Sequence, residues 1–307
     1  MQSRNFLQYF FITLKGMAMG AADVVPGVSG GTIAFISGIY EELITSINNI
    51  NLSLFKTLKN DGLGAFWSQL NGNFLVALFL GIAISVFSLA KIISWLLINE
   101  PVLLWSFFFG LVIASVFFVG KAIEKWNLGT ITVFIVGALA AYFITTLPPS
   151  EHTGSITFLF FSGALAVCAM ILPGISGAFI LVLLGSYKTI LDAVHERDLT
   201  IVATVALGAI IGLLSFAKVL KWMFSNYKNI TLALLTGFIL GSLNKIWPWK
   251  EVLATKTYGD KVITVKEANI SPFSFNGDPQ LMYAVLLGIF GFSVIFILEK
   301  LASKKEN

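Results

Sequence analysis

The chain has 307 residues, of which 57% are apolar and 12% charged, with a formal net charge of +4 and a mean hydropathy of +0.87. A soluble domain carries about 25% charged residues, so this composition excludes an ordinary soluble protein. Several apolar runs reach the ~20 residues that span a bilayer as a helix. They are continuous rather than alternating, which excludes a membrane β-barrel. The sequence therefore predicts an all-α polytopic membrane protein.

The first apolar segment covers residues 6–24 and is followed by Pro26 and Gly27. Proline lacks a backbone N–H and clashes with the preceding turn, and glycine adopts conformations that other residues avoid. We therefore expect the helix to break there, and Ser29 or Thr32 to cap a second helix that ends near residue 47. No small-residue cleavage site follows the segment, so we interpret it as mature structure and not as a signal peptide.

The motif at the first break returns in the second half of the chain. Pro-Gly-Val-Ser-Gly at 26–30 is matched by Pro-Gly-Ile-Ser-Gly at 173–177, and Tyr40 further on is matched by Tyr187. A break that recurs in equivalent surroundings indicates two copies of one unit, each built around a re-entrant helical hairpin. The expected helix breaks are Pro26 and Gly27 in the first copy and Pro173 and Gly174 in the second.

Three further apolar segments follow each hairpin and are long enough to span a bilayer. In the first repeat, residues 1–149, the hairpin 6–47 is followed by spans at about 74–98, 102–122 and 129–147. In the second repeat, residues 150–307, the hairpin 155–193 is followed by spans at about 201–224, 230–247 and 281–299. Polar loops are expected at 48–73 and 250–279, with a short strand at 261–266.

The distribution of charge gives an orientation. Short loops with lysine or arginine face the cytoplasm, which places Arg4, Lys56 and both termini on the cytoplasmic side and the loop 250–279 outside. Each repeat has three crossings, an odd number, so the second repeat is expected to be inverted relative to the first. The two hairpins would then enter from opposite faces. Inverted-topology repeats with broken helices are typical of secondary transporters.

The hairpin tips are the predicted binding site. Non-helical backbone at membrane depth is tolerated only where protein or a wet cavity satisfies it. Helices that restart after the breaks point free N–H groups into such a cavity, which suits an anion such as phosphate. The alternative is a tight turn that only packs against neighbouring helices. The predicted phosphate-binding residues of the tips are Ser29, Gly30, Gly31, Thr32, Ser176 and Gly177.

Three charged residues within apolar segments extend this prediction. Lys91 and Lys218 occupy equivalent places late in two spans, where they would either meet the phosphate or extend toward the membrane interface. Asp23 immediately precedes the first break. A carboxylate at membrane depth is a functional candidate, and it would either carry a coupling proton or hold the turn by accepting hydrogen bonds from nearby N–H groups.

Other kinds of site find no support in the sequence. His152 and His195 both fall in turns without metal-ligand spacing, and there is no phosphate-binding Gly-x-x-x-x-Gly-Lys loop. We therefore expect no metal and no cofactor. Cys168 is the single cysteine, so no internal disulfide can form, and the modest net charge predicts no nucleic-acid partner.

The segment from Met19 to Thr32, with its echo from Leu172 to Gly177, resembles the polyprenyl-phosphate transporter family of bacteria. The resemblance extends over essentially the whole membrane region. It implies a flippase, not an enzyme, that moves undecaprenyl phosphate across the cytoplasmic membrane so that this lipid carrier is recycled for peptidoglycan and other envelope polymers. The expected mechanism is alternating exposure of a site for the phosphate, with coupling to H⁺ or Na⁺ left open.

Two alternatives remain at this stage. Membrane undecaprenyl-pyrophosphate phosphatases also pair re-entrant hairpins, but their motif carries Arg and Ser where this chain has Gly30 and Gly31. Without the arginine, a phosphoryl transition state is hard to stabilise. The second alternative is a small-anion channel, which would show a continuous conductance rather than stepwise transport.

Overall fold

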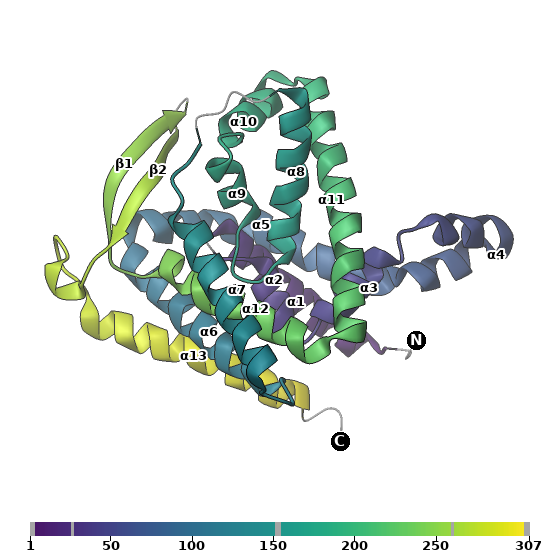
Figure 1. Cartoon of the computed structure of the whole chain (residues 1–307), viewed down its shortest axis with the longest axis horizontal. Helices are drawn as coiled ribbons and strands as arrows, with labels where there is room; N and C mark the ends of the chain where they lie inside the picture. The colour runs from purple at the N-terminus through teal and green to yellow at the C-terminus, as the bar shows by residue number, and fades with distance from the viewer. Residues whose placement is uncertain (1–3, 26–27, 151–154, 259–260, 304–307) are drawn as a thin grey trace.

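The computed structural model describes residues 4–25, 28–150, 155–258 and 261–303 (Figure 1). The first half contains α1 (Phe6–Val24), α2 (Gly30–Ile36), α3 (Tyr40–Asn48), α4 (Leu52–Leu70), α5 (Gly72–Asn99), α6 (Pro101–Lys121) and α7 (Leu128–Thr146). The second half contains α8 (Ile156–Ile171), α9 (Gly177–Leu183), α10 (Tyr187–Glu196), α11 (Leu199–Asn226), α12 (Lys228–Ser242), η1 (Leu243–Ile246), β1 (Lys250–Tyr258), β2 (Lys261–Asn269), η2 (Pro272–Ser274) and α13 (Leu281–Ser303).

Within the described residues, five helical segments are long and apolar enough to cross a membrane. They are Gly72–Leu89, Pro101–Lys121, Leu128–Thr146, Leu199–Asn226 and Lys228–Ile246. The pair α9 and α10, bent by 106°, counts as a sixth if it is taken as one broken span. The prediction of an all-α polytopic membrane protein is confirmed at this level, with one exception, a two-stranded sheet formed by β1 and β2.

Side-chain caps explain where several of these helices begin. The first N–H groups of a helix lack intrahelical partners, and Asn, Asp and Ser side chains supply them. Asn5 and Gln8 form a reciprocal capping box at α1, and Asp198 accepts hydrogen bonds from two N–H groups of α11. At α2, the side chain of Ser29 accepts from the N–H of Gly31, which confirms the predicted cap.

Each half packs its entering helix along its first long helix: α1 lies on α5, and α8 lies on α11. Glycines permit the close approach. A methyl group on Gly81 would overlap the backbone carbonyl of Thr13, and one on Gly208 would overlap that of Phe160. Small residues at such crossings let membrane helices approach backbone to backbone.

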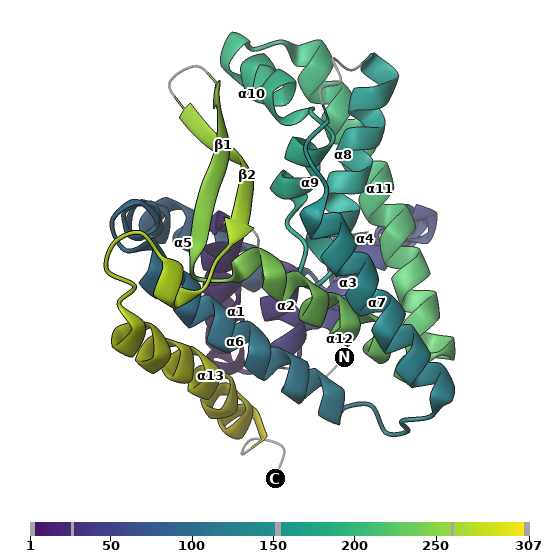
Figure 2. The same cartoon turned by 60° about the vertical axis from the view of Figure 1, so that its left-hand side comes forward.

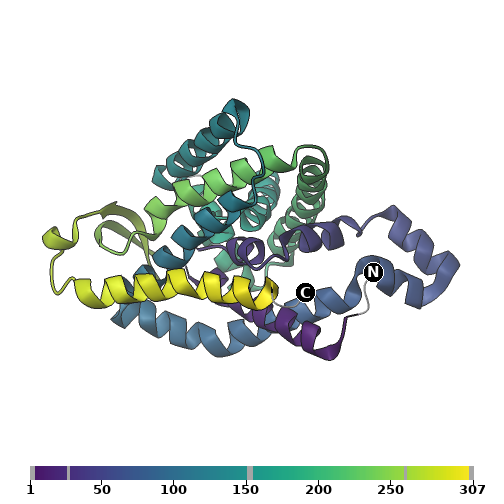
Figure 3. The same cartoon turned by 90° about the horizontal axis from the view of Figure 1, so that it is seen from below.

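The remaining long helices pair between the halves, α6 with α13 and α7 with α12. A glycine again permits close backbone contact at each of these two crossings. A methyl group on Gly110 of α6 would overlap the carbonyl of Gly288 in α13, and one on Gly237 of α12 would overlap the carbonyl of Phe134 in α7. Views from the side and from below show the helices as one body, with α4 extending away from it (Figures 1 and 3).

Two expected segments differ from the sequence prediction. The second helix of each hairpin is broken once more, at Gly38 with φ +73° and at Gly185 with φ +74°, a backbone region in which glycine has no steric penalty. The segment 48–73, expected to be a polar loop, is largely the helix α4, which is capped by Asn51 and broken at Gly62 with φ +81°. Some polar residues of this segment, such as Asn51 and Asn71, therefore lie at the ends of the helix and do not indicate an unstructured loop.

The segment after α12 carries the predicted strand. β2 (Lys261–Asn269) includes it and pairs antiparallel with β1, from Lys250 opposite Asn269 to Tyr258 opposite Lys261. This β hairpin stands beside α9 and α10 (Figure 2). Its base is fixed by two indole N–H groups, of Trp247 to the carbonyl of Ile270 and of Trp249 to that of Pro279.

Candidate functional site

Side chains of the first hairpin form hydrogen bonds with the C-terminal end of α8, the first helix of the second hairpin. The hydroxyl of Ser29 lies 3.1 Å from the carbonyl oxygen of Met170 and 3.3 Å from that of Leu172, and the hydroxyl of Tyr40 donates to the carbonyl of Ile171 over 3.2 Å. These carbonyls end α8 and have no further helical turn to pair with. The two hairpin tips, residues 28–32 and 171–177, are therefore joined by hydrogen bonds.

A reverse contact completes the junction. The N–H of Gly174, in the second tip, donates to the hydroxyl oxygen of Thr32 over 2.9 Å. Ser29 and Thr32 are each 1% exposed, so these hydrogen bonds are shielded from water. Hydrogen bonds between buried groups are costly to break, because each partner is left unsatisfied.

Close packing at the junction explains two of its glycines. A methyl group on Gly31 would lie 2.5 Å from the carbonyl oxygen of Ile171 and 2.9 Å from that of Met170. Gly174 has φ +90°, and a methyl group there would lie 2.6 Å from the hydroxyl of Ser242 in α12. Only glycine fits either position without a shift of backbone or helix.

Asp23 reaches across the first break. Its carboxylate accepts a hydrogen bond from the N–H of Gly30 over 2.7 Å, and a methyl group on Gly30 would lie 2.5 Å from the other carboxylate oxygen. The N–H groups of Gly30 and Gly31 are thus both engaged, by Asp23 and by the Ser29 hydroxyl. The Asp23 carboxylate therefore occupies the acceptor position at the N–H of Gly30.

The second tip is more open than the first. All seven residues of α2 are buried, whereas none of α9 is. Ser176 is half-buried and forms no side-chain capping bond with α9, unlike Ser29 at α2. Gly177 is also only partly buried. The equivalent hairpins therefore differ in exposure in this conformation.

Other predicted site residues lie elsewhere. Lys91 on α5 and Lys218 on α11 are both exposed, and no hydrogen bond or ion pair among the described residues joins either to a tip. Pro173 is buried at the second break, while Pro26 and Gly27 lie outside the described residues. The phosphate-binding roles of Lys91, Lys218 and the residues of the tips stay predictions. No group of three or more His, Cys, Asp or Glu residues with the arrangement of a metal site occurs in the described ranges.

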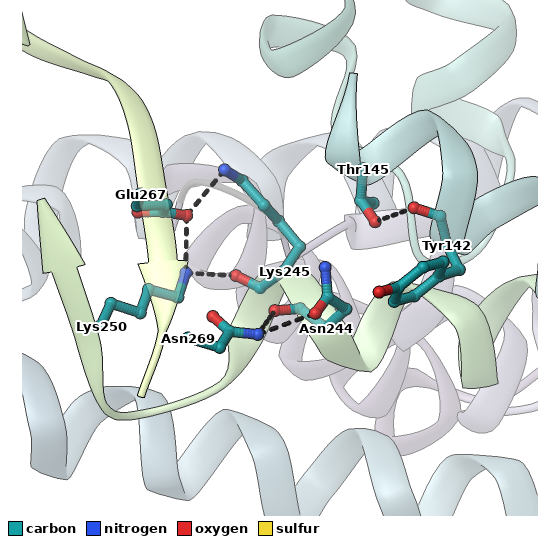
Figure 4. A network of polar contacts seen from close by, with 7 residues as sticks. All are labelled: Tyr142, Thr145, Asn244, Lys245, Lys250, Glu267 and Asn269. Carbon is teal, nitrogen blue, oxygen red and sulfur yellow. Dashed lines mark hydrogen bonds and ion pairs between the residues drawn. The ribbon is translucent and has the colours of Figure 1, made fainter. Parts of the chain in front are cut away.

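An ion-pair cluster near the second tip was missed by the sequence analysis (Figure 4). The ammonium of Lys245, in η1, lies 2.8 Å from one carboxylate oxygen of Glu267, and the ammonium of Lys250, in β1, lies 2.9 Å from the same atom. Burial lowers the pKa of Lys250. Burial raises the pKa of Glu267, but the two lysines outweigh it and leave that pKa below its ordinary value. We name these three residues the Lys–Glu cluster.

Another ion pair joins the start of the chain to α3, between Arg4 and Glu42. Both guanidinium NH₂ groups of Arg4 donate to the carboxylate of Glu42, over 2.6 and 2.7 Å, in the bidentate geometry that favours arginine. A pocket lies between α3 and α11, and its lining includes Glu41, which is next to Glu42 in the chain, together with Thr45 and Lys221. Its lining contains no residue of either hairpin tip, so the geometry of the tips is a better guide to the site.

Comparisons with known proteins give the family. Residues 19–262 match a family described as undecaprenyl phosphate translocase-like. A Vibrio cholerae protein named polyprenyl-phosphate transporter is 46% identical over 303 residues, covering 97% of this chain and 98% of its own length. A Staphylococcus aureus protein of the same name is 33% identical over 254 residues, covering 76% of this chain and 85% of its own. No solved structure matches the chain.

Proposed function

Because the chain belongs to the undecaprenyl phosphate translocase-like family, we propose that it carries undecaprenyl phosphate across the bacterial cytoplasmic membrane. The observation that carries the proposal on the structural side is the junction of two broken hairpins within an apolar helical body. Moving a phosphate anion through hydrocarbon without compensating contacts costs far more than burying a neutral polar group, on the order of tens of kcal/mol. Polar tips reduce this cost while the lipid tail stays among the acyl chains.

The architecture behind this function consists of two inverted-topology repeats, residues 1–149 and 150–307. The recurring contacts support this division, because α1 on α5 is repeated by α8 on α11, and α6 on α13 by α12 on α7. In each of the last two pairings a helix of one half contacts a helix of the other half, and a pseudo-twofold axis that relates the halves would convert one pairing into the other. With both termini in the cytoplasm, the first hairpin enters from the cytoplasmic face and the second from outside.

Alternating exposure of the tips follows from this symmetry. In one state of such a cycle, one hairpin is exposed and its equivalent is buried. The exposure of α9 and the burial of α2 support an outward-open state. The phosphate would first meet Ser176 and Gly177, and after the switch Ser29, Gly30, Gly31 and Thr32. Transporters with inverted repeats exchange the two conformations of their halves in this way.

Asp23 links the site to a coupling ion. Its carboxylate competes with the substrate phosphate for the N–H of Gly30, over 2.7 Å in the present state. Protonation or Na⁺ binding would weaken that competition and free the N–H for phosphate. Uptake of one cation would thereby favour loading of the first tip.

Reconstitution in liposomes tests the function. Purified protein is expected to move labelled undecaprenyl phosphate between leaflets, without releasing phosphate from undecaprenyl pyrophosphate in a parallel assay. Phosphate release would place the protein among the phosphatases instead. A steady ionic conductance in planar bilayers, without lipid movement, would identify an anion channel and refute the proposal.

A further inference from the structure

The Lys–Glu cluster combines two cations with a single carboxylate. Lys245 and Lys250 both contact the same oxygen of Glu267, and their side chains are 22% and 10% exposed. An ammonium has three N–H donors. Lys250 uses a second one on the carbonyl of Lys245, whereas Lys245 has Glu267 as its one hydrogen-bond acceptor among the described residues. The cluster carries a surplus positive charge that an additional anion would neutralise.

Its position links the cluster to the second tip. The ammonium of Lys245 lies over the ring of Phe179 in α9, 5.1 Å from its centre. Ser242, three residues before Lys245, is the residue against which Gly174 of the tip packs. The ammonium of Lys250 lies over the ring of Trp105, 4.7 Å from its centre. Aromatic faces hold a cation in place while its N–H groups remain available to an anion.

The carboxylate and the Lys245 ammonium come from different elements. Glu267 is on β2, in the β hairpin beside the helical body, whereas Lys245 is fixed at the end of α12 (Figures 2 and 4). We propose that Lys245 and Lys250 form a receiving site for the phosphate head group of the lipid, and that the Glu267 carboxylate occupies this site until the substrate displaces it. This inference rests on the proposed transport function.

The chemistry of the exchange is simple anion replacement. A phosphate monoester offers three oxygens and up to two negative charges, so it can pair with both ammonium groups more fully than one carboxylate oxygen can. Displacement would remove the ionic contact between β2 and η1, whereas the side chain of Asn269 would still join the two elements through its hydrogen bonds to Asn244. The head group would thus be bound before it reaches Ser176.

The opposing effects of two changes distinguish a receiving site from a structural ion pair. Binding of a short-chain, water-soluble polyprenyl phosphate to the purified full-length protein is measured by calorimetry. The variant Lys245→Gln with Lys250→Gln is expected to bind about tenfold more weakly, since charge-assisted hydrogen bonds are lost. Glu267→Gln removes the competing charge and is expected to bind roughly three- to tenfold more tightly.

Controls keep this test decisive. Lys56→Gln with Lys59→Gln removes the same charge from exposed positions of α4 and should leave binding unchanged. Lys245→Arg keeps the charge and should retain binding if the double variant fails to fold. Weaker or unchanged binding by Glu267→Gln would overturn the inference, as would equal affinity for inorganic phosphate. If the wild-type protein neither binds nor flips the lipid, the proposed function itself fails; normal flipping with unaffected lysine variants overturns the receiving site alone.

Discussion

Replacing Gly31 by alanine tests the junction of the two tips. The added methyl group would lie 2.5 Å from the carbonyl oxygen of Ile171 and 2.9 Å from that of Met170, both backbone atoms that cannot rotate away. The tips must separate by several tenths of an ångström, which stretches the hydrogen bond from Ser29. Overpacking of this kind costs about 1–3 kcal/mol. Transport is expected to fall by about five- to 150-fold, since each 1.4 kcal/mol changes an equilibrium tenfold.

The matched control is Gly64→Ala. A methyl group at Gly64 meets nothing within 4 Å, and alanine favours the helix in which it lies. Both variants are reconstituted in liposomes, where lipid flipping is measured together with thermal unfolding. We expect Gly64→Ala to match the wild type and Gly31→Ala to lose both stability and transport. Equal behaviour of the two variants would refute the conclusion that close contact of the tips is required.

Three further predictions concern single side chains. Tyr40→Phe leaves the buried carbonyl of Ile171 without its hydrogen bond, so the free energy of unfolding should fall by about 1–3 kcal/mol in a denaturation experiment, and no loss would contradict the contact. Asp23→Asn keeps an acceptor for Gly30 without the charge, so transport should lose its response to a proton or sodium gradient; a retained response would exclude Asp23 as the coupling group. Because the folded-state pKa of Glu267 is lowered, its contribution to stability is present above the ordinary pKa of 4.5 and is lost as the pH falls through the lower folded value. The protection of the β-hairpin amides against hydrogen exchange, taken relative to the intrinsic exchange rate at each pH, should therefore fall on acidification, less so in Glu267→Gln, and an identical acid response of both proteins would contradict this assignment.

The sequence was most informative where backbone chemistry is local. The Pro-Gly motifs predicted that helices stop near residues 24 and 172, and α1 ends at Val24 and α8 at Ile171. Ser29 or Thr32 was predicted as the cap for the same local reason, and the structure shows that Ser29 is the residue that caps α2. The extra breaks at Gly38 and Gly185 were not predicted, because an isolated glycine is also tolerated inside a helix and only its positive φ reveals the turn.

Long-range contacts could not be predicted in the same way. The partner carbonyl of Ser29, at Met170, lies in the other half of the chain, and nothing in the repeated motif shows that the copies touch. Glu267 was one polar residue in a segment read as a loop, and its pairing with Lys245 depends on how the β hairpin folds back. Lys91 and Lys218 were predicted as site residues because their equivalence is visible in the sequence. Whether their side chains reach the tips depends on helix packing, which leaves both exposed.

Alternating exposure of the joined tips is tested most directly by thiol labelling from one side of the membrane. With Cys168 replaced by alanine, Ser176→Cys should react with an impermeant reagent added outside, whereas Ser29→Cys should be protected. Undecaprenyl phosphate should then change the reactivity of the two positions in opposite directions. Reaction of both positions from the same side, with or without the lipid, would indicate a continuous pore and contradict transport by alternating exposure.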